Sequence, residues 1–277
     1  RYVDPRWPAA LLWTAQSSGS AGQPLRIRRD PFGAALEEAF LRRHLRSFGW
    51  SEGWASLVVR AGGPRDPGGP VFDRDRVRGE LRVAASRLDG VAVTAIVERL
   101  HSARIQLIRG YPSALLEIAR RAQLSGLGER LRSAPVRLLH VSSETLDEPD
   151  EALLHQAFGA EVADHYGQAE RALLIQSCPR GARHLIDDYA IGESIDGRWV
   201  GTPLHGCGIL LRYDTGDLCG VVPPGARSCG CGSPFPVVGR VQGRQDDVVV
   251  TSDGRRVGRL GPALRAVEDA EQIQVEQ

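Results

Sequence analysis

Short apolar segments alternate with longer amphipathic ones through roughly the first 165 residues of this chain. In the stretch 33–48, for example, Leu36, Phe40 and other apolar residues recur at the spacing of one helix face. The alternation predicts helices at 33–48, 91–100, 113–123 and 151–158, between strands at 9–16, 56–60, 105–108, 136–141 and 161–165. Ser113 is the predicted N-cap of the third helix. Such alternation is typical of a sheet covered by helices, so we expect an α/β fold.

The pattern changes near residue 184, where apolar runs become short, rich in Val, Ile and Gly, and interrupted by turns. We expect a smaller, mostly β region at 184–250, with a hinge or linker at 239–247. Asp253-Gly254 is a hairpin signal. The predicted boundary between two domains lies at the hinge, with 1–243 in the first domain and 244–277 at the beginning of the second.

The bulk composition favours a cytoplasmic protein that acts on small molecules. The chain has 277 residues, of which 42% are hydrophobic and 25% charged, and its net charge is +1. A net charge this small produces no overall electrostatic attraction to nucleic acid or to a membrane surface. No apolar run approaches the ~20 residues of a membrane helix, and the first residues lack signal-peptide character. A homodimer is compatible with the sequence, which leaves the oligomeric state open.

A hydroxyl- and glycine-rich loop, Ser-Ser-Gly-Ser-Ala-Gly-Gln-Pro at 17–24, is suited to phosphate. Glycines let backbone N–H groups approach an anion, and serine hydroxyls add donors. The predicted phosphate ligands are Ser17, Ser18, Gly19, Ser20 and Gly22. The loop is not a Walker A motif, because the Lys-Ser/Thr ending is absent. Taken alone, such a run is also typical of a flexible turn.

Two carboxylates follow tight turns further along the chain. Glu170 ends Tyr166-Gly167-Gln168-Ala169-Glu170, and a carboxylate near bound phosphates is a natural ligand of Mg²⁺. Asp217 ends Tyr213-Asp214-Thr215-Gly216-Asp217, and a carboxylate can accept hydrogen bonds from both ribose hydroxyls. In isolation, Glu170 could simply favour a helix dipole and Asp217 could be a turn residue.

The order of these three motifs resembles the adenylate-forming superfamily, which includes acyl- and aryl-CoA ligases. Ala21 and Ala169 stand where that family usually has Thr, and Asp214 stands where it has Arg. The resemblance implies an α/β large domain with a smaller β region, followed by the start of a C-terminal domain. Relative to the family, we expect the extreme N-terminal portion and most of the C-terminal domain to be missing here.

The same resemblance assigns roles to further residues. Gly-Arg-Gln-Asp-Asp at 243–247 matches a family motif in which Arg244 contacts the ribose and Asp246 is the pivot of the C-terminal domain. Ser143 and Glu144 fall at the adenine-side segment. Tyr166 and Gly167 belong to the nucleotide site, whereas Tyr111 and His165 are candidates for the acyl pocket. The Gly-Tyr-Pro-Ser run at 110–113 and the sequences at 244–247 and 254–260 are similar to those of the phenylacetate-CoA ligase and CapK-like branch.

Three cysteines and a histidine give an independent signal. Cys178, His184, Cys229 and Cys231 supply the Cys₃His set of a closed structural zinc site. Their spacing departs from the familiar two-residue knuckle, and four unrelated residues, with the cysteines as small buried side chains, are the alternative.

These features predict an enzyme that uses ATP and Mg²⁺ to adenylate a carboxylic acid, with an aromatic acid suggested by the resemblance, and then transfers the acyl group to CoA. Glu170 and Asp246 are its predicted catalytic residues. One alternative acceptor is a carrier protein or an amine. A nucleotide-binding homologue without turnover and a zinc-ribbon binding protein are the alternatives outside this enzyme class.

Overall fold

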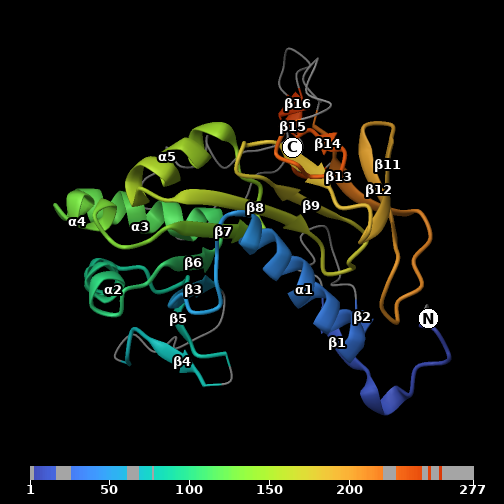
Figure 1. The fold of residues 1–277 in the computed structure, drawn as a ribbon, viewed down its shortest axis with the longest axis horizontal. Helices are drawn as coiled ribbons and strands as arrows, with labels where there is room; N and C mark the ends of the chain where they lie inside the picture. Colours follow the sequence, from blue (N-terminus) through green and yellow to red (C-terminus); the bar gives the residue numbers. More distant parts are fainter. Residues whose placement is uncertain are drawn as a thin grey trace.

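The computed structural model describes residues 3–16, 26–60, 69–76, 78–220 and 229–244, together with the backbone of 249–250 and 256–257. Its centre is a nine-stranded mixed sheet (Figure 1). From one edge to the other the strands are β14 (Val237–Val238), β10 (Arg183–Leu185), β9 (Leu174–Ser177), β8 (Glu161–Gly167), β7 (Leu138–Ser142), β6 (Leu107–Gly110), β3 (Ser56–Arg60), β5 (Glu80–Ala84) and β4 (Asp73–Asp75).

Parallel pairing holds the middle of this sheet together. Strands β5, β3, β6, β7 and β8 are parallel to one another. The outer pairs, β4 with β5, β8 with β9, β9 with β10 and β10 with β14, are antiparallel. The helices are α1 (Pro31–Ser47), α2 (Gly90–Ser102), α3 (Pro112–Leu124), α4 (Gly128–Arg132) and α5 (Glu148–Phe158). The predicted α/β fold is therefore confirmed. The strand predicted at 9–16 begins only at Trp13, and β4, β5, β9 and α4 were not predicted.

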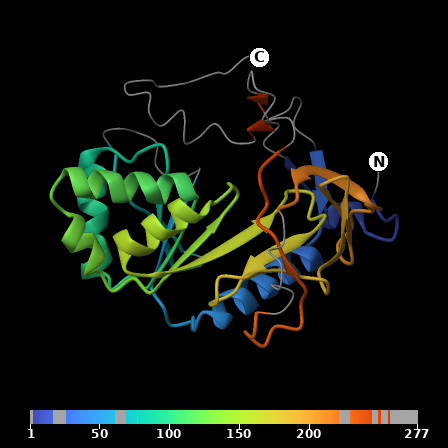
Figure 2. The same ribbon diagram turned by 90° about the horizontal axis from the view of Figure 1, so that it is seen from above.

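The two faces of the sheet carry different helices. Helices α2, α3 and α5 lie on one face, and α1 lies on the other (Figure 2). Ile108 and Leu139 point into the first layer, where they join the core formed with α2, α3 and α5. Leu107 and Leu138, one position earlier on the same strands, contact Leu45 of α1. This change of face with each residue is the period-two alternation of a strand.

Aspartate caps begin three of the helices, whereas the predicted cap of α3 is wrong. Asp30, Asp89 and Asp147 each accept a backbone N–H from three residues further on. Helix α3 instead begins with Pro112 after Tyr111, which caps it without a side-chain hydrogen bond. Pro suits the first helical position because its φ is already set, so Ser113 lies inside the first turn.

The predicted β region is also confirmed. Strands β11 (Ala190–Ile195), β12 (Arg198–Pro203) and β13 (Tyr213–Leu218) form an antiparallel sheet. A short helix η1 (Ala9–Leu11) precedes the pair β1 (Trp13–Gln16) and β2 (Arg26–Arg29). Strand β15 (Val249–Val250) pairs with β16 (Arg256–Val257), as the hairpin signal between them predicts. Tyr189 and Trp199 pack with Phe40 of α1 in a second core cluster.

Asp30 ties the start of α1 to a distant loop. Its carboxylate accepts the N–H of Gly33 at 2.7 Å and that of Cys207 at 2.6 Å, and only 1% of the residue is exposed. Burial alone would raise the pKa of Asp30, but these hydrogen bonds and the charge of Arg171 outweigh it and lower the pKa. The ionised carboxylate therefore matches its surroundings.

Replacement of Asp30 should consequently cost more stability than loss of an ordinary helix cap. Asp30→Ala removes a cap, worth about 1 kcal/mol, and leaves the Cys207 N–H without its partner, at about 1–3 kcal/mol. Asp89→Ala is the matched control, because the hydrogen bond described for its carboxylate is the one from Ala92. Urea denaturation should show a loss of about 2–4 kcal/mol for Asp30→Ala and about 1 kcal/mol for Asp89→Ala. Equal losses would contradict this account.

Candidate functional site

A cavity of about 660 Å³ lies where β7 and β8 end and approach β13. The carboxyl ends of parallel strands are the usual ligand-binding edge of an α/β sheet, and this volume is in the range of small-molecule sites. Eight of the predicted site residues line it: Tyr111, Ser143, Glu144, Tyr166, Gly167, Glu170, Asp217 and Arg244. The predicted phosphate ligands Ser17, Ser18, Gly19, Ser20 and Gly22, and the predicted pivot Asp246, lie outside the described residues.

Asp217 and Tyr166 are in direct contact on the wall of the cavity. The phenol of Tyr166 donates to Oδ2 of Asp217 at 2.6 Å, and burial, together with this carboxylate, raises the pKa of Tyr166 well above its usual value. Thr215 orients the turn: its hydroxyl donates to the carbonyl of Trp199 and accepts the N–H of Asp217. The second and third motifs therefore meet through one short hydrogen bond.

Glu170 projects from the loop that follows β8. The hydroxyl of Tyr213 donates to its Oε1 at 3.3 Å, and burial plus the Glu170 charge raise the pKa of Tyr213 to about 12. The loop continues through Arg171, whose φ of 60° lies in the left-handed region. A carboxylate held in this way, on the wall of a cavity, is a suitable oxygen ligand for Mg²⁺.

The segment after β7 contributes an irregular wall. Ser143 has a φ of 73°, in the left-handed region that non-glycine residues seldom occupy. The Glu144 carboxylate accepts two hydrogen bonds of 2.9 Å, one from the N–H and one from the hydroxyl of Ser113. Glu144 therefore performs the capping function at the start of α3 that the sequence assigned to Ser113.

Arg244 lines the same cavity because the backbone segment that contains it lies beside β13. Its backbone forms an antiparallel bridge with Asp217, and the N–H of Leu218 donates to the carbonyl of Gly243 at 2.8 Å. Gly216, at a φ of 73°, lies under the guanidinium, because a Cβ there would stand 3.3 Å from Nη2 of Arg244. The third motif and the predicted ribose contact are thus neighbours in space.

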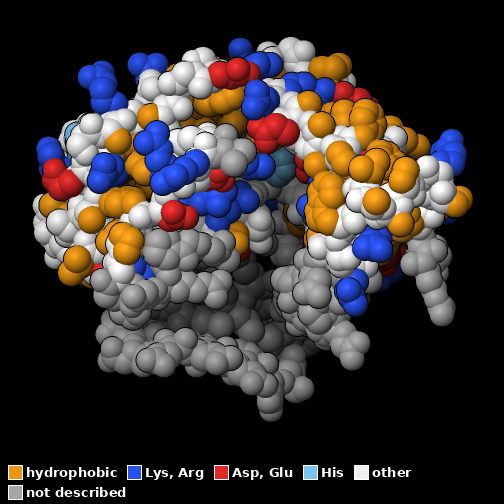
Figure 3. Space-filling model, turned by 90° about the horizontal axis from the view of Figure 1, so that it is seen from below, with side chains coloured by type: hydrophobic (Ala, Val, Ile, Leu, Met, Phe, Trp, Pro, Cys, Tyr) orange, Lys and Arg blue, Asp and Glu red, His pale blue; other side chains and the backbone are white. Residues whose placement is uncertain are grey.

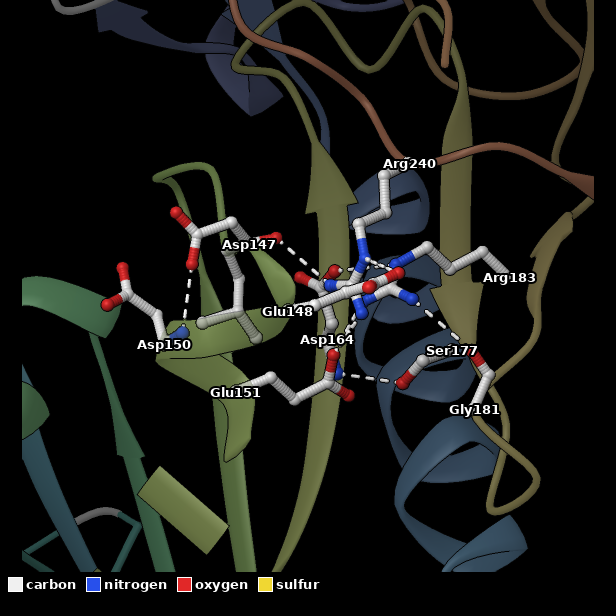
Figure 4. A network of polar contacts seen from close by, with 10 residues as sticks. Asp147, Glu148, Asp150, Glu151, Asp164, Ser177, Gly181, Arg183 and Arg240 are labelled. Carbon is white, nitrogen blue, oxygen red and sulfur yellow. Dashed lines mark hydrogen bonds and ion pairs between the residues drawn. The ribbon is translucent and has the colours of Figure 1, made fainter. Parts of the chain in front are cut away.

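A buried charge network beneath the cavity was missed at the sequence level (Figure 4). Arg183 is 6% exposed and contacts Asp164 at 3.1 Å and Glu151 at 3.2 Å. Arg240 pairs with the same Glu151 and donates to the carbonyl of Leu146 at 3.0 Å. Burial raises the pKa of Asp164 despite its arginine partner. No motif of the sequence pointed to this network, because its partners come from β8, β10, α5 and the segment around Arg240.

The predicted zinc ligands converge at the end of β9 and β10. One ligand atom from each of Cys178, His184, Cys229 and Cys231 lies within 4.8 Å of the others. The Sγ atoms of Cys229 and Cys231 lie 3.2 and 3.4 Å from Nε2 of His184, and Cys178 Sγ lies 3.8 Å from Cys229 Sγ. Such separations are close to those of ligand atoms around one tetrahedral ion.

The orientation of His184 also fits a metal ligand. Its Nδ1 lies 2.8 Å from the carbonyl of Phe235. Because a carbonyl only accepts, Nδ1 carries the proton and Nε2 presents its lone pair to the three sulfurs, as in many protein zinc sites. Burial raises the pKa of the Cys178 thiol to about 11, a cost that binding of a cation would offset.

The remaining acyl-pocket candidate, His165, does not line this cavity. Its ring lies instead among those of His44 and His140, between the sheet and α1. Within the part of the chain that the structure describes, no helix has the length and apolar character needed to span a membrane.

Comparisons with known proteins identify the fold. No protein-family profile and no curated protein matches the sequence. A structure of 2-hydroxyisobutyryl-CoA ligase in the postadenylation state, in complex with 2-HIB-AMP, matches with a TM-score of 0.67 at 18% identity, over 95% of this chain and 58% of that one. O-succinylbenzoate coenzyme A synthetase from Bacillus subtilis, in complex with ATP and magnesium ion, matches with a TM-score of 0.54 at 13% identity, over 88% of this chain and 52% of that one.

An open conformation of the first ligase, in complex with 2-HIB-AMP and CoA, matches with a TM-score of 0.62 over 64% of its chain. The chain thus spans less than two thirds of the length of these ligases. Within that span, the described residues share the α/β fold of these CoA ligases.

Proposed function

We propose that this chain carries the nucleotide site of an AMP-forming acid–thiol ligase. The observation that carries the proposal is that Glu170, the Tyr166–Asp217 pair and Arg244 line one cavity at the edge of a sheet with the ligase fold. The matched ligases were solved with acyl-adenylates, CoA, ATP and magnesium. The resemblance of the motifs to the adenylate-forming superfamily supports the same assignment.

The proposed reaction has two steps. An oxygen of the acid attacks the α-phosphorus of ATP, the bond to the β-phosphate oxygen breaks, and pyrophosphate leaves with the negative charge. The thiol of CoA then attacks the acyl carbon, and AMP leaves as the thioester forms. Mg²⁺ would neutralise charge on the phosphates during the first step. Both steps need the nucleotide to be held at its two ends.

Each part of the cavity has a proposed task. Asp217 accepts hydrogen bonds from the ribose hydroxyls, with Arg244 beside it, and Glu170 holds Mg²⁺. The segment at 143–144 contacts the adenine, and Tyr111 borders the acyl group. The loop at 17–22 holds the β- and γ-phosphates. Asp246 serves as the pivot between a first domain, 1–243, and a second that begins at 244.

The identity of the acid and of the acceptor belongs to the same proposal. An aromatic acid and a place in the phenylacetate-CoA ligase branch are supported by the motifs at 110–113 and 254–260. The location is cytoplasmic, and CoA is the proposed acceptor, with a carrier protein or an amine as the alternative. Acid-dependent ATP–pyrophosphate exchange separates an enzyme from a binding homologue, and thioester formation with free CoA separates the acceptors.

Asp217→Ala should weaken nucleotide binding. Hydrogen bonds to a charged group contribute about 1.5–3 kcal/mol, so the Kd for AMP measured by calorimetry should rise roughly ten- to a hundredfold. Tyr166→Phe is the comparison, because it keeps the carboxylate of Asp217 and removes only the hydroxyl that donates to it, and its effect should be smaller. An unchanged Kd in Asp217→Ala would remove Asp217 from the ribose site.

Glu170→Gln should impair catalysis through Mg²⁺. The amide keeps the shape of the side chain and loses the charge, so exchange of pyrophosphate should fall by roughly a hundredfold or more, while the Kd for AMP without magnesium stays near that of the wild type. Glu193→Gln is the control, because Glu193 lies on β11, pairs with Arg212 and does not line the cavity. Equal exchange rates in Glu170→Gln and the wild type would refute the metal role.

The Cys₃His cluster is proposed to hold structural Zn²⁺. Cys229→Ser should release one equivalent of zinc per chain and lower Tm by several degrees, because a structural metal contributes its binding free energy to folding. Cys219→Ser is the matched control, since Cys219 lies outside the cluster. Elemental analysis and thermal unfolding measure both effects, and a zinc content that Cys229→Ser leaves unaltered would contradict the assignment.

A further inference from the structure

Three histidines meet on the face of the sheet opposite α2, α3 and α5. His44 comes from α1, His140 from β7 and His165 from β8, and one ring nitrogen from each lies within 4.8 Å of the others. His140 and His165 project to the same face because they occupy positions of the same parity on adjacent parallel strands, with His140 opposite Ala163 and His165 opposite Ser142. Neither the nucleotide cavity nor the cysteine cluster includes them.

The three rings are spaced as the ligands of one ion would be. Their centroids lie 5.7 Å apart for His44 and His140, 5.9 Å for His44 and His165, and 5.3 Å for His140 and His165. Three imidazoles that bind one tetrahedral ion at about 2.0–2.1 Å have centroids roughly 5 Å apart. Small shifts of the side chains are therefore enough to complete a site.

Hydrogen bonding leaves ring nitrogens without partners. His44 is 3% exposed, and its Nε2 lies 2.9 Å from the carbonyl of Ser177, so Nε2 carries the proton and Nδ1 holds a lone pair. Nδ1 of His44 and both ring nitrogens of His140, a residue only 2% exposed, are buried and have no hydrogen-bond partner among the described residues. Buried polar atoms of this kind are costly, and a bound ion would account for them.

Gln176 orients the third ring. Its Nε2 lies 3.3 Å from Nδ1 of His165 and 3.4 Å from the carbonyl of Phe40. Ligation through Nε2 of His165 requires a proton on Nδ1. Oε1 of Gln176 accepts a hydrogen bond from this Nδ1–H once the carboxamide is turned so that Oε1 faces the ring, at the expense of its long contact with Phe40. A ligand histidine that donates to such a neighbouring oxygen is usual in metal sites.

All three imidazoles are neutral at physiological pH. Burial lowers the pKa of His44 to about 4 and that of His165 to about 3, and it lowers the pKa of His140 well below its usual value. The neighbouring histidines and the charges of Arg60 and Arg109 act in the same direction on His140 and His165. Neutral rings are the form that binds a metal.

The charges around the cluster constrain its ligand. Arg109 is paired with Glu80 at 2.9 Å, and Arg60 donates to Ser142. The cluster itself consists of imidazoles without a carboxylate, which disfavours Ca²⁺ and Mg²⁺ and suits Zn²⁺ or a similar transition metal. Because two arginines are close, an anion is the expected fourth ligand.

We propose that His44, His140 and His165 form a second metal site, which takes Zn²⁺ through three imidazole nitrogens and leaves a fourth position for hydroxide or another small anion. The ion would clamp α1 onto β7 and β8. Helix α1 follows the predicted phosphate loop, and the ends of β7 and β8 form the wall of the nucleotide cavity. The site would therefore stabilise the elements on which the cavity is built.

The test uses the full chain in a Cys229→Ser background, so that the cysteine cluster does not contribute. After removal of metal with a chelator, Zn²⁺ is added alone and its binding is measured by calorimetry. The background protein should bind one equivalent of Zn²⁺, and addition of His140→Phe should abolish this binding. His205→Phe is the matched control. The ring nitrogens of His205 also have no hydrogen-bond partner in the part of the chain that the structure describes, and His205 lies outside the cluster. Its variant should still bind one equivalent.

Thermal unfolding separates metal loss from misfolding. Without metal, His140→Phe should be at least as stable as its background, because it removes two buried unpartnered nitrogens. Saturating Zn²⁺ should raise Tm in the background and in His205→Phe and leave it unchanged in His140→Phe. Zinc binding or a zinc-dependent rise in Tm that persists in His140→Phe would overturn the proposal, as would a background protein that binds no Zn²⁺. Neither readout depends on whether the chain activates acids.

Discussion

The parallel pairing of β7 with β8 is the constraint on which the rest of this structure depends. It aligns the two strands residue by residue, so that side chains of one parity enter the core with α2, α3 and α5 and those of the other face α1. It also brings the ends of the two strands to one edge, where the loops beginning at Ser143 and Gln168 diverge. The two strands thereby contribute residues to three places: the core on one face, the histidine cluster on the other, and the cavity at their ends.

The same pairing explains why a buried charge network lies at the cavity. The side chain of Asp164 points from β8 toward the cavity, and that of the next residue, His165, points toward α1. Its carboxylate needs a partner in that position, and Arg183 from β10 supplies one. Breaking a buried ion pair is strongly destabilising. The network therefore fixes the positions of β8, β10 and the segment around Arg240 relative to one another. A rigid floor of this kind suits a site that must orient a nucleotide.

Local patterns predicted the parts of the fold that depend on local physics. Apolar spacing located α1, α2, α3 and α5 and most of the central parallel strands, but not β5 or α4. The motifs ending at Glu170 and Asp217 contribute residues to one cavity. The cap of α3 was missed because Glu144, which binds Ser113, comes from a different loop. Arg183 and the histidine trio were missed for the same reason, since their partners are set by strand order and register. Short sequence patterns carry no information about strand order or register.

Strand order therefore also links the two faces of the sheet energetically. An ion held by His44, His140 and His165 would stabilise the α1–β7–β8 arrangement against local opening, and a nucleotide bound at the strand ends would stabilise the same arrangement from the other side. Two ligands that favour one conformation assist each other's binding, by reciprocal amounts. The size of that coupling is limited by how far β7 and β8 depart from the bound arrangement when both sites are empty. The buried ion pairs of Arg183 with Asp164 and Glu151 oppose such a departure. We therefore expect the coupling to be small and the metal to act mainly on stability.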